Sequence, residues 1–414
     1  ALARLPAEEP CLRGTALMHL GEQLVEEARR MTGEGAINRL GAAKAALDEA
    51  LTVLRQKDDR DGIASAQVVL ASFHYAQSQR LPASERAAHL CAAAKALRAA
   101  LDHCSAETDP VEQARDRHNL AVILGALAEA TPDRLERAQH LEESKEAFRA
   151  ATLALENGKQ EWDAAILRSN FSHHLVRQIE RADEGNRPVL AREAVKNAER
   201  ALQVFDPVRE PVVWAQAQRR LGLAYLEQAR LTQGAARDTT FDAAAAAFRA
   251  ALQAMEDTGL ERDRAQLWSN LADTLRLRFS RKGDAGAKEP LMEAANAYRS
   301  ALAVFTEEGA EKHAETQERL AWTLVLLAKN AEDEAERRSN LSAAVEAARA
   351  ALGIWTEAEN PDAFARVEAD LGFTTGSRKV GVAHGHNTPG SSSEARWSRS
   401  SRAEFGKEAA EIAN

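Results

Sequence analysis

Hydrophobic residues recur along this chain at the spacing of an α-helix, and the whole pattern restarts about every fifty residues. In residues 211–231, for example, Leu221, Ala224 and Tyr225 fall on one helical face. With Leu221 as an anchor, the equivalent positions 49 to 51 residues apart are Leu20, Leu70, Leu120, Phe171, Leu271, Leu320 and Leu371. Self-similarity at such a period predicts an array of stacked repeats.

Small residues occupy fixed positions within each period. The residue after each anchor is Gly21, Ala71, Ala121, Ser172, Gly222, Ala272, Ala321 or Gly372. A second set of small residues, in pairs seven apart, is Ala43 and Ala50, Ala93 and Ala100, Ser144 and Ala151, Ala194 and Ala201, Ala244 and Ala251, Ala294 and Ala301, and Ala344 and Ala351. Large residues stand at one further position, namely Leu47, Leu97, Phe148, Phe248 and Tyr298. Helices that approach closely need such small sites for a neighbour's large side chain, and this need explains a glycine in mid-helix at position 222.

Each period predicts two helices of about 20 residues, or roughly 30 Å. Four prolines, each ten residues before an anchor, mark the start of the first helix: Pro10, Pro110, Pro211 and Pro361. Proline suits the first helical turn because the N–H group that it lacks has no partner there. Thr131-Pro132 and Arg187-Pro188 introduce the second helix of their periods.

These motifs resemble the tetratricopeptide repeat, whose first helix carries W-x2-L-G-x2-Y and whose second carries A-x3-F-x2-A. The first motif is matched by Leu221-Gly222-x2-Tyr225 and by Trp268-x2-Leu271-Ala272, and the second by Ala244-x3-Phe248-x2-Ala251 and Ala294-x3-Tyr298-x2-Ala301. The resemblance covers residues 1 to about 374, with a period of about 50 in place of 34. It implies an all-α, right-handed α-solenoid superhelix of about seven antiparallel helix pairs, with the first helices inside.

The two ends of the chain depart from the array. Ala1-Leu2 stand one period before Ala50-Leu51, so we expect the sequence to open inside the second helix of a preceding repeat. Residues 375–414 are rich in Gly, Ser and Arg and have no helical pattern over most of their length, which predicts a disordered tail with a short terminal helix. The repeat array is therefore expected over residues 1–374.

Charge and composition exclude several classes of protein. A net charge of −9 disfavours nucleic-acid binding, and no apolar run approaches the roughly 20 residues that span a membrane. Cys11, Cys91 and Cys104 lack metal-ligand spacing, and we expect reduced thiols packed in a cytoplasmic protein. The tryptophans at 162, 214, 268 and 322 are expected in the core.

No motif for catalysis, for a cofactor or for a metal is found in the sequence. His173 and His174 are adjacent on a helix and point about 100° apart, so a structural pair is expected there, and His384 and His386 lie in the tail. No phosphate-binding loop, nucleophile elbow or H-E-x-x-H is present. The many carboxylates alternate with arginines, as on solvated helix faces.

A column of polar residues directly before the anchors is the best candidate for a binding surface. Its members are Asn119, Asn170, Arg220, Asn270 and Arg319. Asn can both donate to and accept from a peptide backbone, and Arg can bind a carboxylate. A second row, Arg115, Arg219 and Arg276, is expected on the same helix faces and would favour acidic ligands. The alternatives are that the asparagines bond only to neighbouring helices and loops, and that the arginines are simply solvated.

The resemblance, of the kinesin-light-chain type, implies that this column lies on the concave surface. It implies a non-enzymatic scaffold that binds a peptide or partner helix of another protein, an acidic one if the arginines take part. The alternative is a sensing or autoinhibitory arm of a larger enzyme whose catalytic part is outside this chain. Bacterial chains with such long repeats are often joined to protease-like or nucleotide-binding domains.

Overall fold

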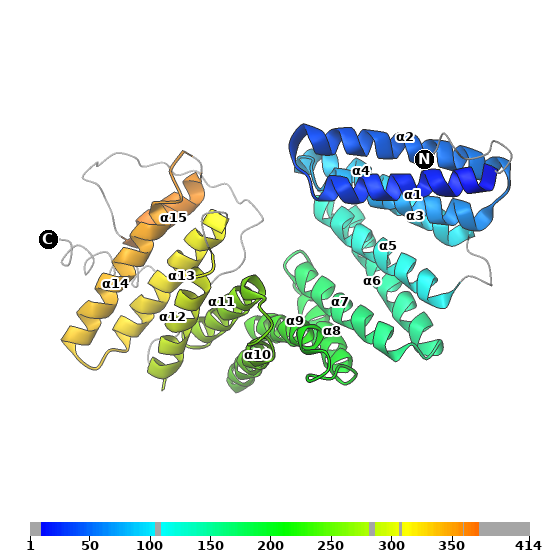
Figure 1. Ribbon diagram of the computed structural model, residues 1–414. Coiled ribbons are helices and arrows are strands. Elements are labelled where there is room, and N and C mark those ends of the chain that lie inside the picture. The colour runs from blue at the N-terminus through cyan, green and yellow to red at the C-terminus, as the bar shows by residue number, and fades with distance from the viewer. Residues whose placement is uncertain (1–9, 104–108, 281–285, 306–308, 359, 372–414) are drawn as a thin grey trace. The chain divides into compact units, whose positions relative to one another are not determined.

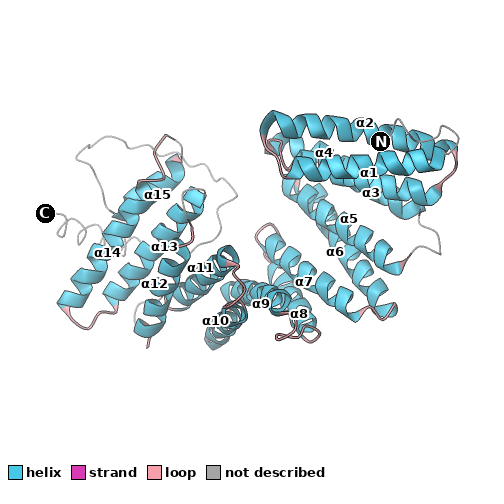
Figure 2. Ribbon diagram, in the orientation of Figure 1, coloured by secondary structure: helices cyan, strands magenta, loops and turns pink. Residues whose placement is uncertain are grey.

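The computed structural model describes residues 10–103, 109–280, 286–305, 309–358 and 360–371. These residues form fifteen α-helices and no strand (Figures 1 and 2). Successive helices pack against one another in pairs, which confirms the predicted all-α repeat. The chain divides into two compact units, one ending at Glu184 and one beginning at Gly185.

Each of the seven expected periods contributes a first helix and a second helix. In the first unit these are α1 (Pro10–Arg29), α2 (Gly33–Gln56), α3 (Arg60–Ser78), α4 (Ala83–His103), α5 (Pro110–Ala130), α6 (Arg134–Asn157) and α7 (Glu161–Ile179). In the second unit they are α8 (Arg187–Leu202), α9 (Pro211–Leu231), α10 (Ala235–Ala254), α11 (Glu261–Arg278), α12 (Lys288–Leu302), α13 (Ala310–Lys329), α14 (Glu334–Leu352) and α15 (Pro361–Leu371).

The helix starts follow the expected signals. The four prolines before the anchors are the first residues of α1, α5, α9 and α15. Aspartates cap several other starts, because a carboxylate accepts from backbone N–H groups that have no partner within the helix. Asp133, for example, accepts from the N–H groups of Leu135 and Glu136 at the start of α6.

The small residues that recur in the second helices form the spine of both cores. All fourteen positions of the paired set, from Ala43 to Ala351, are 0% exposed. The large residues also lie where predicted, since Leu47, Phe148, Phe248 and Tyr298 are 0% exposed and Leu97 is 1% exposed. A Cβ atom on Gly222 would lie 2.7 Å from two ring carbons of Phe248, and one on Gly21 would lie 2.7 Å from Leu47 Cγ. The predicted docking of large residues onto small ones is therefore confirmed at these crossings.

Gly222→Leu should lower the free energy of unfolding by about 1–3 kcal/mol, because the added side chain overlaps the buried Phe248 ring. Gly41, exposed in mid-α2 with nothing within 4 Å of its added Cβ, supplies the control. Gly41→Ala should raise stability by about 0.5–1 kcal/mol through helix propensity. Denaturant titration followed by circular dichroism measures both changes, and an unchanged Gly222→Leu variant would contradict the assigned crossing.

Two expectations about burial are wrong. Trp162 is 45% exposed, although Trp268 and Trp322 do pack partly buried against the core. The Cys91 thiol is exposed on α4 and is not packed. The expected preceding helix, the side chains of Cys11 and Cys104, the tail with His384 and His386, and Gly372 lie outside the described residues. None of the described helices is both long and apolar enough to cross a membrane.

Candidate functional site

Three cavities join along the first helices of the first unit. A cavity of about 610 Å³ lies at the amino-terminal halves of α3 and α5, and one of about 640 Å³ lies at the carboxyl-terminal halves of α3, α5 and α7. A cavity of about 280 Å³ lies between them. This middle cavity shares Val68 and Asn119 with the amino-terminal cavity, and it shares Tyr75 and Val122 with the carboxyl-terminal cavity. We call these three adjoining cavities together the first-unit groove.

The amino-terminal cavity is acidic. Five carboxylates line it, against one arginine, Arg115: they are Glu22, Asp61, Asp109, Glu112 and Asp116. Met18, Val68 and Val69 supply an apolar floor. A cationic side chain entering this acidic cavity would find carboxylates on α1, α3 and α5.

Asp116 is the most perturbed carboxyl of the acidic cavity. Burial, and then the neighbouring charge of Glu112, raise its pKa to about 6 against the opposing effects of Arg115 and Arg117. The folded protein therefore keeps a proton on this carboxyl at pH values where the unfolded chain has lost it. Asp116 thus reduces stability as the pH rises through about 4 to 6.

Asp116→Asn should raise the free energy of unfolding by an amount on the order of 1 kcal/mol near neutral pH, after allowance for solvent screening. Near pH 3, below both pKa values, the variant and the parent should be equally stable, since the parent carboxyl is then protonated when folded and largely protonated when unfolded. Denaturant titrations at the two pH values measure the difference. An equal gain at both would show that ionisation is not the cause.

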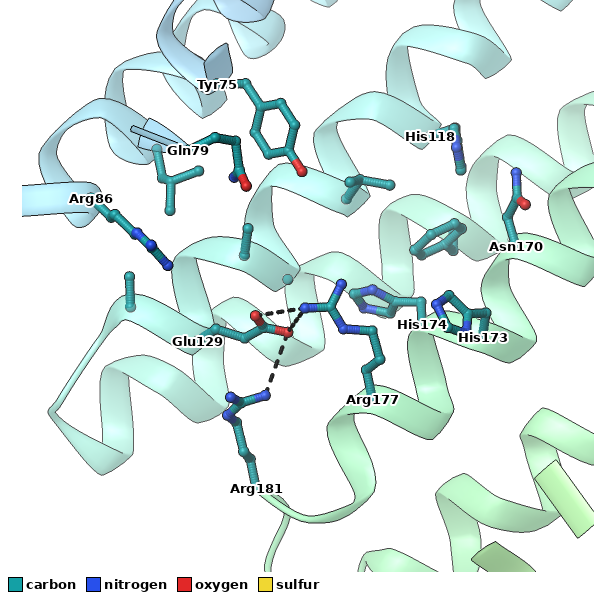
Figure 3. A pocket seen from close by; sticks show the side chains of 16 residues that line it. Tyr75, Gln79, Arg86, His118, Glu129, Asn170, His173, His174, Arg177 and Arg181 are labelled. Carbon is teal, nitrogen blue, oxygen red and sulfur yellow. Dashed lines mark hydrogen bonds and ion pairs between the residues drawn. The ribbon is translucent and has the colours of Figure 1, made fainter. Parts of the chain in front are cut away.

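The carboxyl-terminal cavity is basic and rich in histidine (Figure 3). Arg86, Arg177 and Arg181 line it together with a single carboxylate, Glu129. The other polar side chains around it are Tyr75, Gln79, His118, Asn170, His173 and His174. They come from α3, α5 and α7, with Gln79 directly after the end of α3, and Arg86 comes from α4.

Glu129 holds two of the arginines of the basic cavity in place. Arg177 Nη2 donates to both Glu129 oxygens at 2.8 Å, and Arg181 Nη1 lies 3.4 Å from the same carboxylate (Figure 3). Arg86 donates through Nε to the Leu81 carbonyl at 2.8 Å, and it forms no ion pair with a carboxylate of the described residues. Three guanidinium groups thus face one carboxylate.

His174 belongs to the wall of the basic cavity. Its Nε2 atom lies 2.8 Å from both Ser144 Oγ and Gln178 Nε2, and its ring centroid lies 4.8 Å from that of Phe148. Burial, and then the charge of Arg177, lower its pKa to about 3, so the ring is neutral at ordinary pH. A Cβ on Gly125 would lie 2.2 Å from His174 Cε1, which explains a glycine inside α5.

The first-unit groove brings together three of the residues predicted from sequence. Arg115 lines the acidic cavity, Asn119 lines both the acidic and the middle cavities, and Asn170 lines the basic cavity. Both asparagines are half-buried. They therefore lie where a ligand in the groove would meet them.

The residues predicted in the second unit have different surroundings. Asn270 Oδ1 accepts from Gln266 Nε2 at 3.2 Å, and Arg219 lines a separate cavity with Arg262 and Lys312. Arg220 is half-buried, and burial followed by the charge of Arg219 lowers its pKa to about 10. These three residues do not lie in the first-unit groove.

Arg276 and Arg319 belong to a buried polar network around Asp273. Arg276 is 1% exposed, donates to Asp273 Oδ1 at 3.1 Å and to the Tyr298 hydroxyl at 3.2 Å, and lies 4.7 Å from the centroid of the Trp322 ring. Arg319 Nη1 donates to Asp273 Oδ2 at 3.0 Å. The expected exposed row of Arg115, Arg219 and Arg276 therefore does not extend to Arg276, because its guanidinium lies inside the protein.

Sequence inspection missed the arginines of the basic cavity. Asn170, His173, Arg177 and Arg181 are spaced by three, four and four residues, so they form one stripe on α7 and just beyond its end. Extending the search along that stripe from Asn170 would have found them. Arg86 carried no such signal, because it comes from a second helix.

Comparisons with known proteins give distant likenesses. No family profile and no curated protein matches the sequence. Among solved structures, a circular tandem repeat protein with novel repeat topology is 18% identical over 86% of this chain and 89% of its own, with a TM-score of 0.35. The S. pombe nuclear import adaptor Nro1 is 16% identical over 87% of this chain and 99% of its own, with a TM-score of 0.30.

Proposed function

We propose that this chain is a non-enzymatic interaction scaffold and that its first unit binds a segment of a partner protein in the first-unit groove. The observation that carries this proposal is the row of three adjoining cavities along α3 and α5, which share lining residues and carry many polar side chains. Repeat proteins bind ligands on such surfaces, because stacked helices present an extended surface to an elongated ligand.

The dimensions of the groove fit a peptide. The 19 residues of α3 correspond to about 28 Å, which an extended segment of about nine residues or a helix of about 19 would span. Asn119 stands where two of the cavities meet, and Asn170 stands in the third. Amide side chains can hold a peptide backbone at both places without selecting its sequence.

Selection of peptides from a random library on the purified chain tests this proposal. The enriched peptides should bind the Asn119→Ala/Asn170→Ala variant about tenfold more weakly, since each lost hydrogen bond is worth about 0.5–1.5 kcal/mol. Asn38→Ala, the same change at an exposed site on α2, is the matched control and should have no effect. If no enriched peptide responds to the groove variant, the binding surface lies elsewhere.

A further inference from the structure

The first helices of the first unit run in the same direction past the groove. The amino-terminal halves of α3 and α5 line the acidic cavity, and the carboxyl-terminal halves of α3, α5 and α7 line the basic one. Asp61 and Glu112 stand in first turns, and Arg177 stands in a last turn. Each charge therefore stabilises the macrodipole of its own helix.

Because the helices are parallel, Asp61 and Glu112 stand at one end of the groove and Arg177 stands at the other. In an antiparallel bundle the charges at neighbouring helix ends would alternate in sign. Here five carboxylates face one arginine in the acidic cavity, whereas three arginines face one carboxylate in the basic cavity. The middle cavity is mixed, since apolar and polar side chains line it together: they are Val68, Ala71, Leu97, Val122 and Ile123, with Arg29, Ser72, Tyr75 and Asn119. The groove is thus polarised along its length.

We infer that the first-unit groove selects a partner segment whose two ends carry opposite charge, with its lysine or arginine end in the acidic cavity and its carboxylate end in the basic cavity. The inference rests on the proposed function and deepens it, because it specifies the chemistry and the orientation of the partner. A segment that carries one sign of charge throughout is repelled at one end of the groove, so it binds more weakly than a segment whose two ends carry opposite charges.

The basic cavity offers defined partners to a carboxylate. The Nη atoms of Arg86 have no ion-pair partner among the described side chains, and the Tyr75 hydroxyl lines the same space. Arg177 and Arg181 are held by Glu129 and do not have to be ordered on binding (Figure 3). At the other end, Asp61 and Glu112 are exposed and lie on two different helices.

Synthetic peptides of equal composition test the inference. Each has about 20 residues, enough to span the groove as a chain or a helix. In two segregated peptides, one end third carries lysines, the opposite end third carries glutamates, and the middle third is alanine and leucine; the two peptides differ in which end carries the lysines. A control peptide alternates lysine and glutamate along its length. We expect one segregated peptide to bind at least about tenfold more tightly than the control by calorimetry, with the advantage shrinking at high salt.

Charge reversals locate the effect on the protein. Arg86→Glu and Glu112→Lys should each weaken the segregated peptide about threefold or more, and Arg86→Glu should improve binding of a peptide with lysines at both ends. Arg55→Glu on α2 and Glu146→Lys on α6 are matched controls on exposed sites that line no part of the groove, and they should change nothing.

The outcomes separate this inference from the proposed function. Suppose that library peptides depend on Asn119 and Asn170, but that the protein binds the segregated and the alternating peptides with equal affinity. This result would overturn the inference and leave the proposed function standing. Equal binding by the charge-reversed variants and their controls would overturn it too. If no peptide depends on the groove asparagines, both fail.

Discussion

The Asp273→Ala variant should lose about 3–5 kcal/mol of unfolding free energy, because it leaves the guanidinium of Arg276 buried without its carboxylate partner. Asp273 also accepts from the Tyr298 hydroxyl at 2.6 Å and from Arg319 at 3.0 Å. Truncation therefore removes the acceptor for three donors at once. Denaturant titration of the second-unit transition, followed by fluorescence of Trp322 beside Arg276, measures the loss.

Two further variants show whether the unpaired charge is the cause. Adding Arg276→Met to Asp273→Ala removes the buried cation, so the double variant should be more stable than Asp273→Ala alone. Asp257→Ala changes an exposed aspartate of the same unit and should stay within about 0.5 kcal/mol of the parent. A double variant no better than the single one would mean that lost packing, and not the uncompensated charge, sets the cost.

The network also predicts a dependence on pH. Burial by itself raises the pKa of Asp273, but Arg319, Arg276 and the Tyr298 hydroxyl outweigh burial and hold it below its ordinary value of 3.8. The carboxylate therefore contributes its full stability above that value and loses it as the pH falls through the lowered pKa. The stability difference between parent and Asp273→Ala should shrink over this acidic range.

Phe148→Ala should cost the first unit about 3–5 kcal/mol. The Phe148 side chain is 0% exposed, its ring stacks on Phe171 at 4.8 Å, and His118 meets it edge-on at 5.2 Å. Its loss opens a hole beneath the basic cavity, so the NMR signals of the His118 and His174 rings should shift as well. Thermal or denaturant unfolding measures the stability of the variant.

The repeat itself supplies the control for Phe148. Leucine fills the same position in α2 and α4, as Leu47 and Leu97, so Phe148→Leu should cost clearly less than Phe148→Ala. An alanine variant as stable as the leucine variant would show that the ring is not needed to fill this core.

The fold could be predicted from the sequence because position within the repeat determines burial. Fourteen small positions and five large ones have the burial that their spacing predicts. Trp162 departs from this rule because it belongs to no recurring position, and a lone aromatic residue carries no information about the face on which it lies.

The candidate site was only partly predictable. Asn119 and Asn170, singled out from the sequence, do line the first-unit groove. Arg276 was expected on a ligand-facing row but is buried, and its own position in the repeat gave a warning. Five residues after the anchor, other periods have Val25, Leu226 and Val325, which are 1%, 5% and 2% exposed. Tyr298 gave a second signal, since a hydroxyl at a position otherwise filled by Leu or Phe needs a buried polar partner. Which cations and carboxylates share a cavity depends on how helices of different periods pack against one another, and the periodicity does not specify that.

Packing between near neighbours in the chain has a consequence for synthesis on the ribosome. Within each unit the substantial contacts join helices that are adjacent or next but one in sequence, as α1 joins α2 and α3. Chains with such short contact separations fold in microseconds to milliseconds, whereas a ribosome adds about 5–20 residues per second. Each helix pair can therefore close before the next has emerged, so the nascent chain exposes no more than about one unfinished pair at a time.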